Sequence, residues 1–441
     1  GVAIVIKFAS AGLAFLMFVV MAMITDERQF GLFSATYAGA SLVSYFASVG
    51  QQATVLRFWP QYAGNGDLGA AHGMIARAIL VTLAGLVVSS LLVLIVGFLP
   101  FVSETTPEWR PLCAAAAVLS FALGWSEFSS GAFRAKNRLV TGLLPRDIIW
   151  RAATIAAVLA LHFAHVKISA VAATSLTAGL LVVSVVPQTI TLLRDTLRAQ
   201  RGPLTQMQRS EFKTVTLGLW GVTSLPPALG QISTLLVAAI LGPEIAGAIF
   251  VAERTTRFVA LALNGINQAL APQISAAFYS GDRAHVQRIT SLAALGGFVM
   301  GLLVLIVFWV FGGLILSLFN PAYATPAIRT TLVVFGIGAA YGTACGPIEV
   351  LLQLTGLQQA LFNLLVIVNV VGLCITAIAT YLFGPIGAAV GIAGTVIAWT
   401  TFGVAIARRR IGINPSILGF LTRAGDARDP DAPAGLARGR T

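Results

Sequence analysis

Residues 242–289 read GPEIAGAIFVAERTTRFVALALNGINQALAPQISAAFYSGDRAHVQRI, and this stretch decides how the chain is organised. After a Gly-Pro turn it stays apolar for longer than a bilayer is thick. Yet it carries Glu253, Arg254 and Arg257 near the middle of the apolar run. Charges at that depth cost at least ~2.5–3.5 kcal/mol each, so they usually face a bundle interior or a wet cavity.

The polar residues of this stretch continue at helical spacing. Arg254, Arg257, Asn264 and Gln268 share one stripe of a helix, and Glu253 lies beside it. One side of a membrane-spanning helix is therefore predicted to meet something hydrophilic.

The composition indicates a membrane protein. Of the 441 residues, 57% are hydrophobic and only 10% are charged, whereas a soluble protein carries about 25% charged residues. The net charge of +12 lies in short loops and at the C-terminus, which favours a positive-inside topology over nucleic-acid binding. The sequence has no Walker loop and no metal-binding motif, so we predict no cofactor and no metal.

Runs of about 20 apolar residues predict spanning helices. Twelve such runs occur, and the sequence therefore predicts an all-α polytopic fold with about twelve spans. The predicted spans are 2–25, 30–50, 74–99, 111–132, 148–166, 168–191, 214–241, 245–269, 290–319, 327–352, 358–383 and 385–407.

The basic residues fix the predicted orientation. Most lie in loops on one side or in the tail, and the opposite side holds only Arg28, Arg110, Lys167 and Arg329. This bias places both termini in the cytoplasm. The external loops are too short to hold a catalytic domain, so we do not expect an enzyme.

The chain divides into halves that resemble a repeat. Residues 30–67 align with residues 246–282 through a Gly, a Pro, an aromatic residue and a closing Gly-Asp. The predicted organisation is two pseudo-symmetric six-helix lobes with a linker and a basic, disordered tail. In order these are 1–193, 194–213, 214–407 and 408–441. Transporters commonly place their site between such halves.

Arg254 and Arg257 are the first candidates for substrate binding, because planar guanidinium groups donate paired hydrogen bonds to phosphate. The alternative is that Glu253 pairs with Arg257, four residues on, and neutralises it. Arg254 would then remain, so the region keeps a positive charge in either case.

Three further cations, Lys7, Arg57 and Arg151, lie near the predicted cytoplasmic ends of helices in the first half. They are candidates to complete a cationic cavity. Alternatively, each extends to the lipid headgroups and has no role in binding.

Two acidic residues are candidates for coupling to a proton or cation: Glu127 and Glu349, about a turn inside the cytoplasmic ends of their helices. Interface-facing carboxylates are the simpler interpretation. Pro226 and Pro227 lie midway along the seventh helix and predict a kink there, which suits a gate or a static bend.

Several segments resemble the polysaccharide flippases, whose superfamily also holds multidrug and toxin extruders and lipid II flippases. The similar segments include ITDERQFGLFSATYA near the first helix, the stretch at 242–289, FNPAYATPAIRTTLVVFGIGAAYGTACGPIEVLLQLTG, and FGPIGAAVGIAGTVIAW. Lipid II flippases have fourteen helices, which disfavours that branch. Drug extruders carry an acidic residue and a proline in the first helix, where this chain has Lys7 and Gly12.

The resemblance implies two lobes around a central cavity in the bacterial inner membrane, working by alternating access. It implies an undecaprenyl-diphosphate oligosaccharide as substrate, as in O-antigen or lipopolysaccharide assembly, with cavity cations holding the head group. Membrane lipids and other polysaccharide-assembly proteins are the implied partners. The alternative function is a cation-coupled drug or solute antiporter of the same fold.

Overall fold

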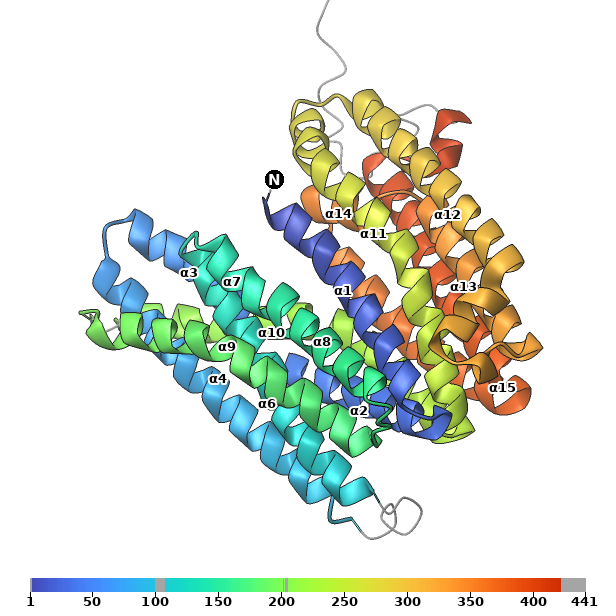
Figure 1. The fold of residues 1–441 in the computed structure, drawn as a ribbon. Helices are drawn as coiled ribbons and strands as arrows, with labels where there is room; N and C mark the ends of the chain where they lie inside the picture. Colours follow the sequence, from blue (N-terminus) through green and yellow to red (C-terminus); the bar gives the residue numbers. More distant parts are fainter. Residues whose placement is uncertain (1, 100–107, 201, 203–204, 422–441) are drawn as a thin grey trace, which may run out of the picture. The chain divides into compact units, whose positions relative to one another are not determined.

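The computed structural model describes residues 2–99, 108–200, 202 and 205–421. Within helices, the side chains of residues 2–4, 222, 226, 258–269 and 272 lie outside this description. The described residues form helices joined by short turns and contain no strand (Figure 1). This confirms the predicted all-α class.

Each of the twelve predicted spans consists largely of helical residues. Eight helices of the described part are long and apolar enough to cross a membrane, or nine if the two parts of α10 (Gln206–Leu241) count as one span. These two parts meet at an angle of 43° between Leu225 and Pro227, where the proline pair predicts a kink. The connection between α9 (Ala170–Arg198) and α10 is shorter than the predicted linker 194–213. Helix α9 continues into the linker, and α10 begins within it at Gln206.

The chain folds into two compact units. Unit 1 comprises Gly1–Thr255, Gly312–Thr331 and Ala377–Ala388, and unit 2 comprises Thr256–Phe311, Leu332–Thr376 and Ala389–Thr441. These units differ from the two sequence halves, because α11 (Pro243–Tyr279), α12 (Arg283–Phe319), α13 (Pro326–Ala344) and α15 (Gln358–Ile411) contribute to both. The division into two six-helix lobes stays a prediction.

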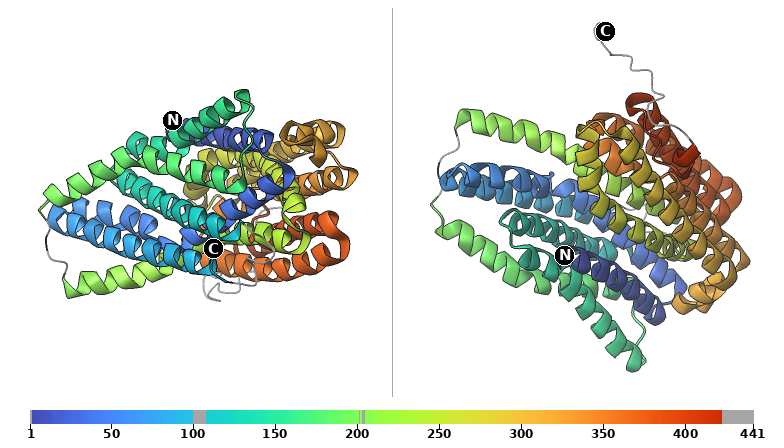
Figure 2. Two further views of the ribbon diagram at one scale, coloured as in Figure 1. Left: turned by 60° about the horizontal axis from the view of Figure 1, so that its bottom comes forward. Right: turned by 90° about the horizontal axis from the view of Figure 1, so that it is seen from above.

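Unit 1 is organised around α6. The elements of unit 1 before α10 are α1 (Val2–Ile24), α2 (Glu27–Ala47), α3 (Gln51–Gly64), α4 (Leu68–Val96), α6 (Trp109–Ala135), α7 (Leu139–Leu144), η1 (Pro145–Ile149), α8 (Trp150–Phe163) and α9. Helix α6 contacts α2, α3, α4 and α9, and α4, α6 and α9 run side by side in Figures 1 and 2. Small residues permit this packing: a Cβ on Gly131 would lie 2.9 Å from the backbone oxygen of Gln52.

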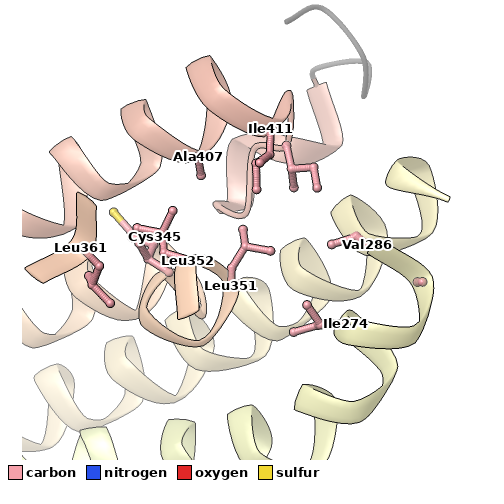
Figure 3. Packing of buried hydrophobic residues seen from close by; sticks show 11 residues of the cluster. Ile274, Val286, Cys345, Leu351, Leu352, Leu361, Ala407 and Ile411 are labelled. Carbon is pink, nitrogen blue, oxygen red and sulfur yellow. The ribbon is translucent and has the colours of Figure 1, made fainter. Parts of the chain in front are cut away.

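Unit 2 has its core where α11, α12, α14 (Ile348–Leu354) and the end of α15 meet. The buried side chains there include Ile274, Val286, Leu351 and Ile411, which converge in Figure 3. Burial of such a side chain is worth about 1.5–3 kcal/mol in water, but in a bilayer close packing supplies more of the stability.

Helix α15 contains a sharp reversal. Gly384 has φ 61° and ψ −138°, a conformation that favours glycine, and it lies between the eleventh and twelfth predicted spans. The two arms pack closely, since a Cβ on Gly387 would lie 1.9 Å from the carbonyl oxygen of Ala379. One on Gly391 would lie 2.6 Å from the Cα of Thr376. Both predicted spans are therefore present as a hairpin.

The structure corrects the prediction for the first part of the tail. Residues 412–421, which we name the C-terminal segment, are packed rather than disordered, and they include the short 3-10 helix η3 (Ile417–Leu421). Ile413 is fully buried, and Asn414 and Ser416 are nearly so. The reason is local composition: apolar residues here give the segment something to bury. Residues 422–441 lie outside the description.

Candidate functional site: a charged network in unit 1

Five charged side chains from four helical elements of unit 1 form a connected group, which we name the charged network. Its members are Lys7 on α1, Glu127 on α6, Arg146 and Asp147 on η1 and Arg151 on α8. Such a group within membrane-spanning elements is a functional-site hypothesis by default.

Asp147 joins two of the cations. Its carboxylate lies 2.6 Å from Lys7 Nζ and 3.9 Å from an Arg151 guanidinium nitrogen, and its side chain is only 4% exposed. Lys7 is 48% exposed, so water reaches one side of this group. Arg151 donates further hydrogen bonds to the backbone oxygen and hydroxyl of Ser10 on α1. Helices α1 and α8 are thus tied together by polar contacts.

The local backbone explains this arrangement. Pro145 has no N–H, and the chain widens at that point into the π-helical turn η1, from Pro145 to Ile149. Single π turns inside helices are frequent at functional sites. Asp147 and Arg151 are four residues apart and therefore share a helix face.

A second ion pair, between Arg146 and Glu127, joins η1 to α6. Trp150 donates its indole N–H to the backbone oxygen of Arg146 and packs at full burial beside it.

Arg254 is held by aromatic rings. Its guanidinium carbon lies 4.6 Å from the ring centroid of Phe250 and 5.6 Å from that of Phe18. Phe18 itself packs edge-on against Phe250, with ring centroids 4.9 Å apart. Stacking on ring faces suits arginine because its planar cation is weakly hydrated.

The network is cationic as a whole. Lys7, Arg146 and Arg151 face two carboxylates, Glu127 and Asp147, which leaves one formal positive charge. The network therefore favours an anion. Phosphate oxygens are well matched to the network, because arginine donates forked hydrogen bonds to them.

The structure brings together only part of the predicted site. Lys7, Arg151 and Glu127 join the network. Arg254 stacks on Phe250 and Phe18 of the same unit, and Arg57 lies apart. Arg57 is 54% exposed and lies 3.9 Å from Glu211 of α10.

The other predicted residues have separate surroundings. Glu349 is exposed on α14 and accepts a hydrogen bond from Gln353, outside the network. Glu253 is half-buried, and Arg257 is exposed on the unit 2 part of α11. The backbones of Asn264, Gln268 and Pro226 are helical, but their side chains lie outside the described residues. Pro227 follows the bend of α10.

Sequence reasoning missed Arg146 and Asp147. Arg146 was assigned to a cytoplasmic loop, and Asp147 received no role. The signal was present as PRDIIWR, where a proline precedes an acidic and a basic residue spaced four apart. Their partners on α1 and α6 come from tertiary contacts, which no spacing rule supplies.

The fold is that of a multi-pass membrane transporter. The chain is similar to an inward-facing multidrug resistance MATE family transporter of the MOP superfamily, with a TM-score of 0.73 and 15% identity over 90% of this chain and 94% of that one. It is also similar to the lipid II flippase MurJ in an inward closed conformation, with a TM-score of 0.67 and 14% identity over 92% and 87% of the two chains. A MOP superfamily transporter from Pyrococcus furiosus gives 0.60 and 16% over 92% and 93%.

The family follows from sequence. The pattern of the family described as "Polysaccharide biosynthesis protein" matches residues 1–278, which is more than half of the chain. The chain therefore belongs to the polysaccharide biosynthesis protein family. None of the curated proteins matches it in sequence. Its long apolar helices agree with a multi-pass membrane protein of that family.

Proposed function

We propose that this protein moves a lipid-linked oligosaccharide, carried on undecaprenyl diphosphate, across the bacterial inner membrane by alternating access. The observation that carries the proposal is the net positive charge of the charged network. A diphosphate head group has the negative charge and the oxygen acceptors that such cations bind. Membership of a polysaccharide biosynthesis family supports a glycan-bearing substrate.

The network suggests how the head group is held. Lys7 is half-exposed and bound to Asp147, so a phosphate oxygen can approach it without displacing buried side chains. Arg151 and Arg146 are held in place by Ser10, Trp150 and the two carboxylates. Pre-positioned cations bind an anion more tightly because less side-chain freedom is lost.

Arg254 and Arg257 of α11 are further candidate ligands of the phosphate groups. They are three residues apart and share a face of that helix. The bend of α10 at Pro227 is our candidate for the gate, and both termini are proposed to be cytoplasmic.

The test is translocation of a fluorescent undecaprenyl-diphosphate oligosaccharide in proteoliposomes. We expect transport by the wild type and loss of at least tenfold in the Arg254→Gln, Arg257→Gln double variant. Arg28→Gln is the matched control, because Arg28 is 40% exposed and its partner Glu108 lies 3.6 Å away, outside the network.

Two outcomes contradict the proposal in different ways. Undiminished transport by the double variant would remove the α11 arginines from the site and keep the substrate. No transport by the wild type, together with proton-driven export of cationic dyes, would favour the antiporter. In that case Glu127 becomes the candidate coupling carboxylate.

A further inference from the structure

A second feature lies in unit 2, apart from the charged network. It is a cavity of ≈ 520 Å³ lined by α12, α13, α15 and η3. Its lining includes Leu302 of α12, Ile337 and Tyr341 of α13, Thr401 of α15 and Leu418 of η3. This volume is in the usual range of ligand sites, about 300–1,000 Å³. The charged network contributes no residue to it.

The chemistry of the lining fits hydrocarbon. Its side chains are almost all apolar, and two of its hydroxyl groups satisfy each other: Tyr341 Oη lies 2.9 Å from Thr401 Oγ1. Leu302 is 42% exposed and Ile337 is 48% exposed, so the cavity opens to the surface of the chain. An apolar opening among membrane-spanning helices favours a lipid chain over a polar solute.

One wall of the cavity is built by the C-terminal segment, which is fixed by specific bonds. Gln287 of α12 donates to the carbonyl oxygen of Gly419 at 2.8 Å and accepts from the N–H of Asn414 at 3.1 Å. Ser291 donates to the carbonyl oxygen of Asn414 at 3.3 Å. A Cβ on Gly419 would lie 2.1 Å from the Ser291 hydroxyl, so glycine permits this close approach.

Positive charge lies one turn beyond the cavity. Thr401 and Val404 line the cavity from α15, and Arg408 follows them on the same helix face, about 6 Å further along the axis. Arg408 is exposed. An apolar cavity with a cation one helical turn away matches a lipid whose acyl chain is joined to a phosphate.

The C-terminal segment, which follows Arg408, Arg409 and Arg410 in the chain, has an interfacial character. Leu418, Phe420 and Leu421 are 58%, 51% and 84% exposed. Apolar side chains next to exposed arginines are typical of a segment lying at the boundary between headgroups and acyl chains. The cavity therefore opens at the depth where a phospholipid changes from chain to head group.

We propose that unit 2 binds an anionic phospholipid, with one acyl chain in the cavity and the phosphate at Arg408. The juxtaposition of an apolar cavity with a cation on the same face carries this inference. The site is independent of the transported substrate, whose head group we assign to unit 1. A cavity of this size holds a single acyl chain, whereas a long polyprenyl tail would extend well beyond it.

The test is photo-crosslinking of the full chain in nanodiscs. The probe is phosphatidylglycerol with a diazirine near the end of one acyl chain, compared with the same label on phosphatidylcholine and on undecaprenyl phosphate. Labelled peptides are identified by mass spectrometry. We expect phosphatidylglycerol to label α12 and α13 near Leu302 and Ile337 more strongly than either comparison lipid.

Matched variants make the test specific. Leu302→Trp fills the cavity and should reduce labelling severalfold. Leu303→Trp should not, because Leu303 is 52% exposed but is not part of the lining. Arg408→Gln should reduce the preference for phosphatidylglycerol about fivefold, from the ~1 kcal/mol typical of one basic residue at a membrane surface. Arg410→Gln, on another face of α15, should retain the preference.

Three results would overturn the proposal. Equal labelling in the two tryptophan variants would show that the cavity is not occupied. Equal labelling by both phospholipids would show that charge plays no part. Preferential labelling by undecaprenyl phosphate would assign the cavity to the substrate tail. Thermal unfolding of each variant is recorded alongside, so that a folding defect is recognised separately.

Discussion

Replacing Asp147 by asparagine tests whether the charged network holds unit 1 together. The side chain of Asp147 is 4% exposed and that of Arg151 is 16% exposed, so this part of the network is buried. Removing one partner of a buried ion pair typically costs 3–5 kcal/mol, because the remaining charge stays desolvated. Asparagine keeps the size of the side chain, and Lys7 is partly solvated. We therefore expect destabilisation by about 3 kcal/mol.

Lys7→Gln is the internal comparison. Its side chain is 48% exposed, so water already screens most of the interaction with Asp147. Exposed ion pairs contribute about 0–1 kcal/mol, and we expect a loss within that range. The two variants remove opposite ends of one 2.6 Å contact, yet they should differ several-fold in effect.

The chain supplies its own reporter for the assay. Cys113 and Cys345 are buried and Cys374 is exposed, so a thiol-reactive dye reports unfolding once Cys374 is changed to serine. A loss of about 3 kcal/mol should lower the apparent Tm by several degrees, and Lys7→Gln should lower it by at most a degree or two. An unchanged Tm in Asp147→Asn, or a larger fall in Lys7→Gln, would refute the reasoning.

Three further predictions follow from single features. Gly384→Ala should destabilise by about 1–3 kcal/mol, since φ 61° disfavours a Cβ; Gly394→Ala, with open space around it, should leave the Tm almost unchanged in the same thiol assay. Gln287→Ala should release the C-terminal segment, seen as at least tenfold faster amide hydrogen exchange over residues 412–421, and unchanged exchange would show that packing alone holds it. Arg57→Gln should reduce translocation less than Arg151→Gln in the proteoliposome assay, because the structure keeps Arg57 in an exposed pair outside the network; an equal loss would return it to the site.

The membrane-spanning architecture follows directly from the sequence. Apolar runs and turn residues are local signals, and a bilayer leaves helices as the simplest way to satisfy the backbone. The reversal at Gly384 lies between the predicted spans 358–383 and 385–407. The bend of α10 lies where the proline pair predicts a kink.

The charged network was only partly predictable. Lys7 and Arg151 were identified because each is a cation in an apolar run. Their partners were not, because Asp147 meets Lys7 across 140 positions of the sequence. Arg57 has the same local signal as Arg151 but a different neighbour, Glu211. Which cations converge is decided by packing between helices.

The bonds between α12 and the C-terminal segment also have a consequence for biogenesis. Gln287 is joined to Asn414 and Gly419, which follow it by 127 and 132 residues. At translation speeds of ~5–20 residues per second, α12 leaves the ribosome roughly 6–25 s before the segment that completes its packing. During that interval the insertion machinery or a neighbouring helix must shelter its polar face. A reporter domain fused directly after Ile411 would prolong that exposure, whereas one placed after Leu421 would leave the segment free to close.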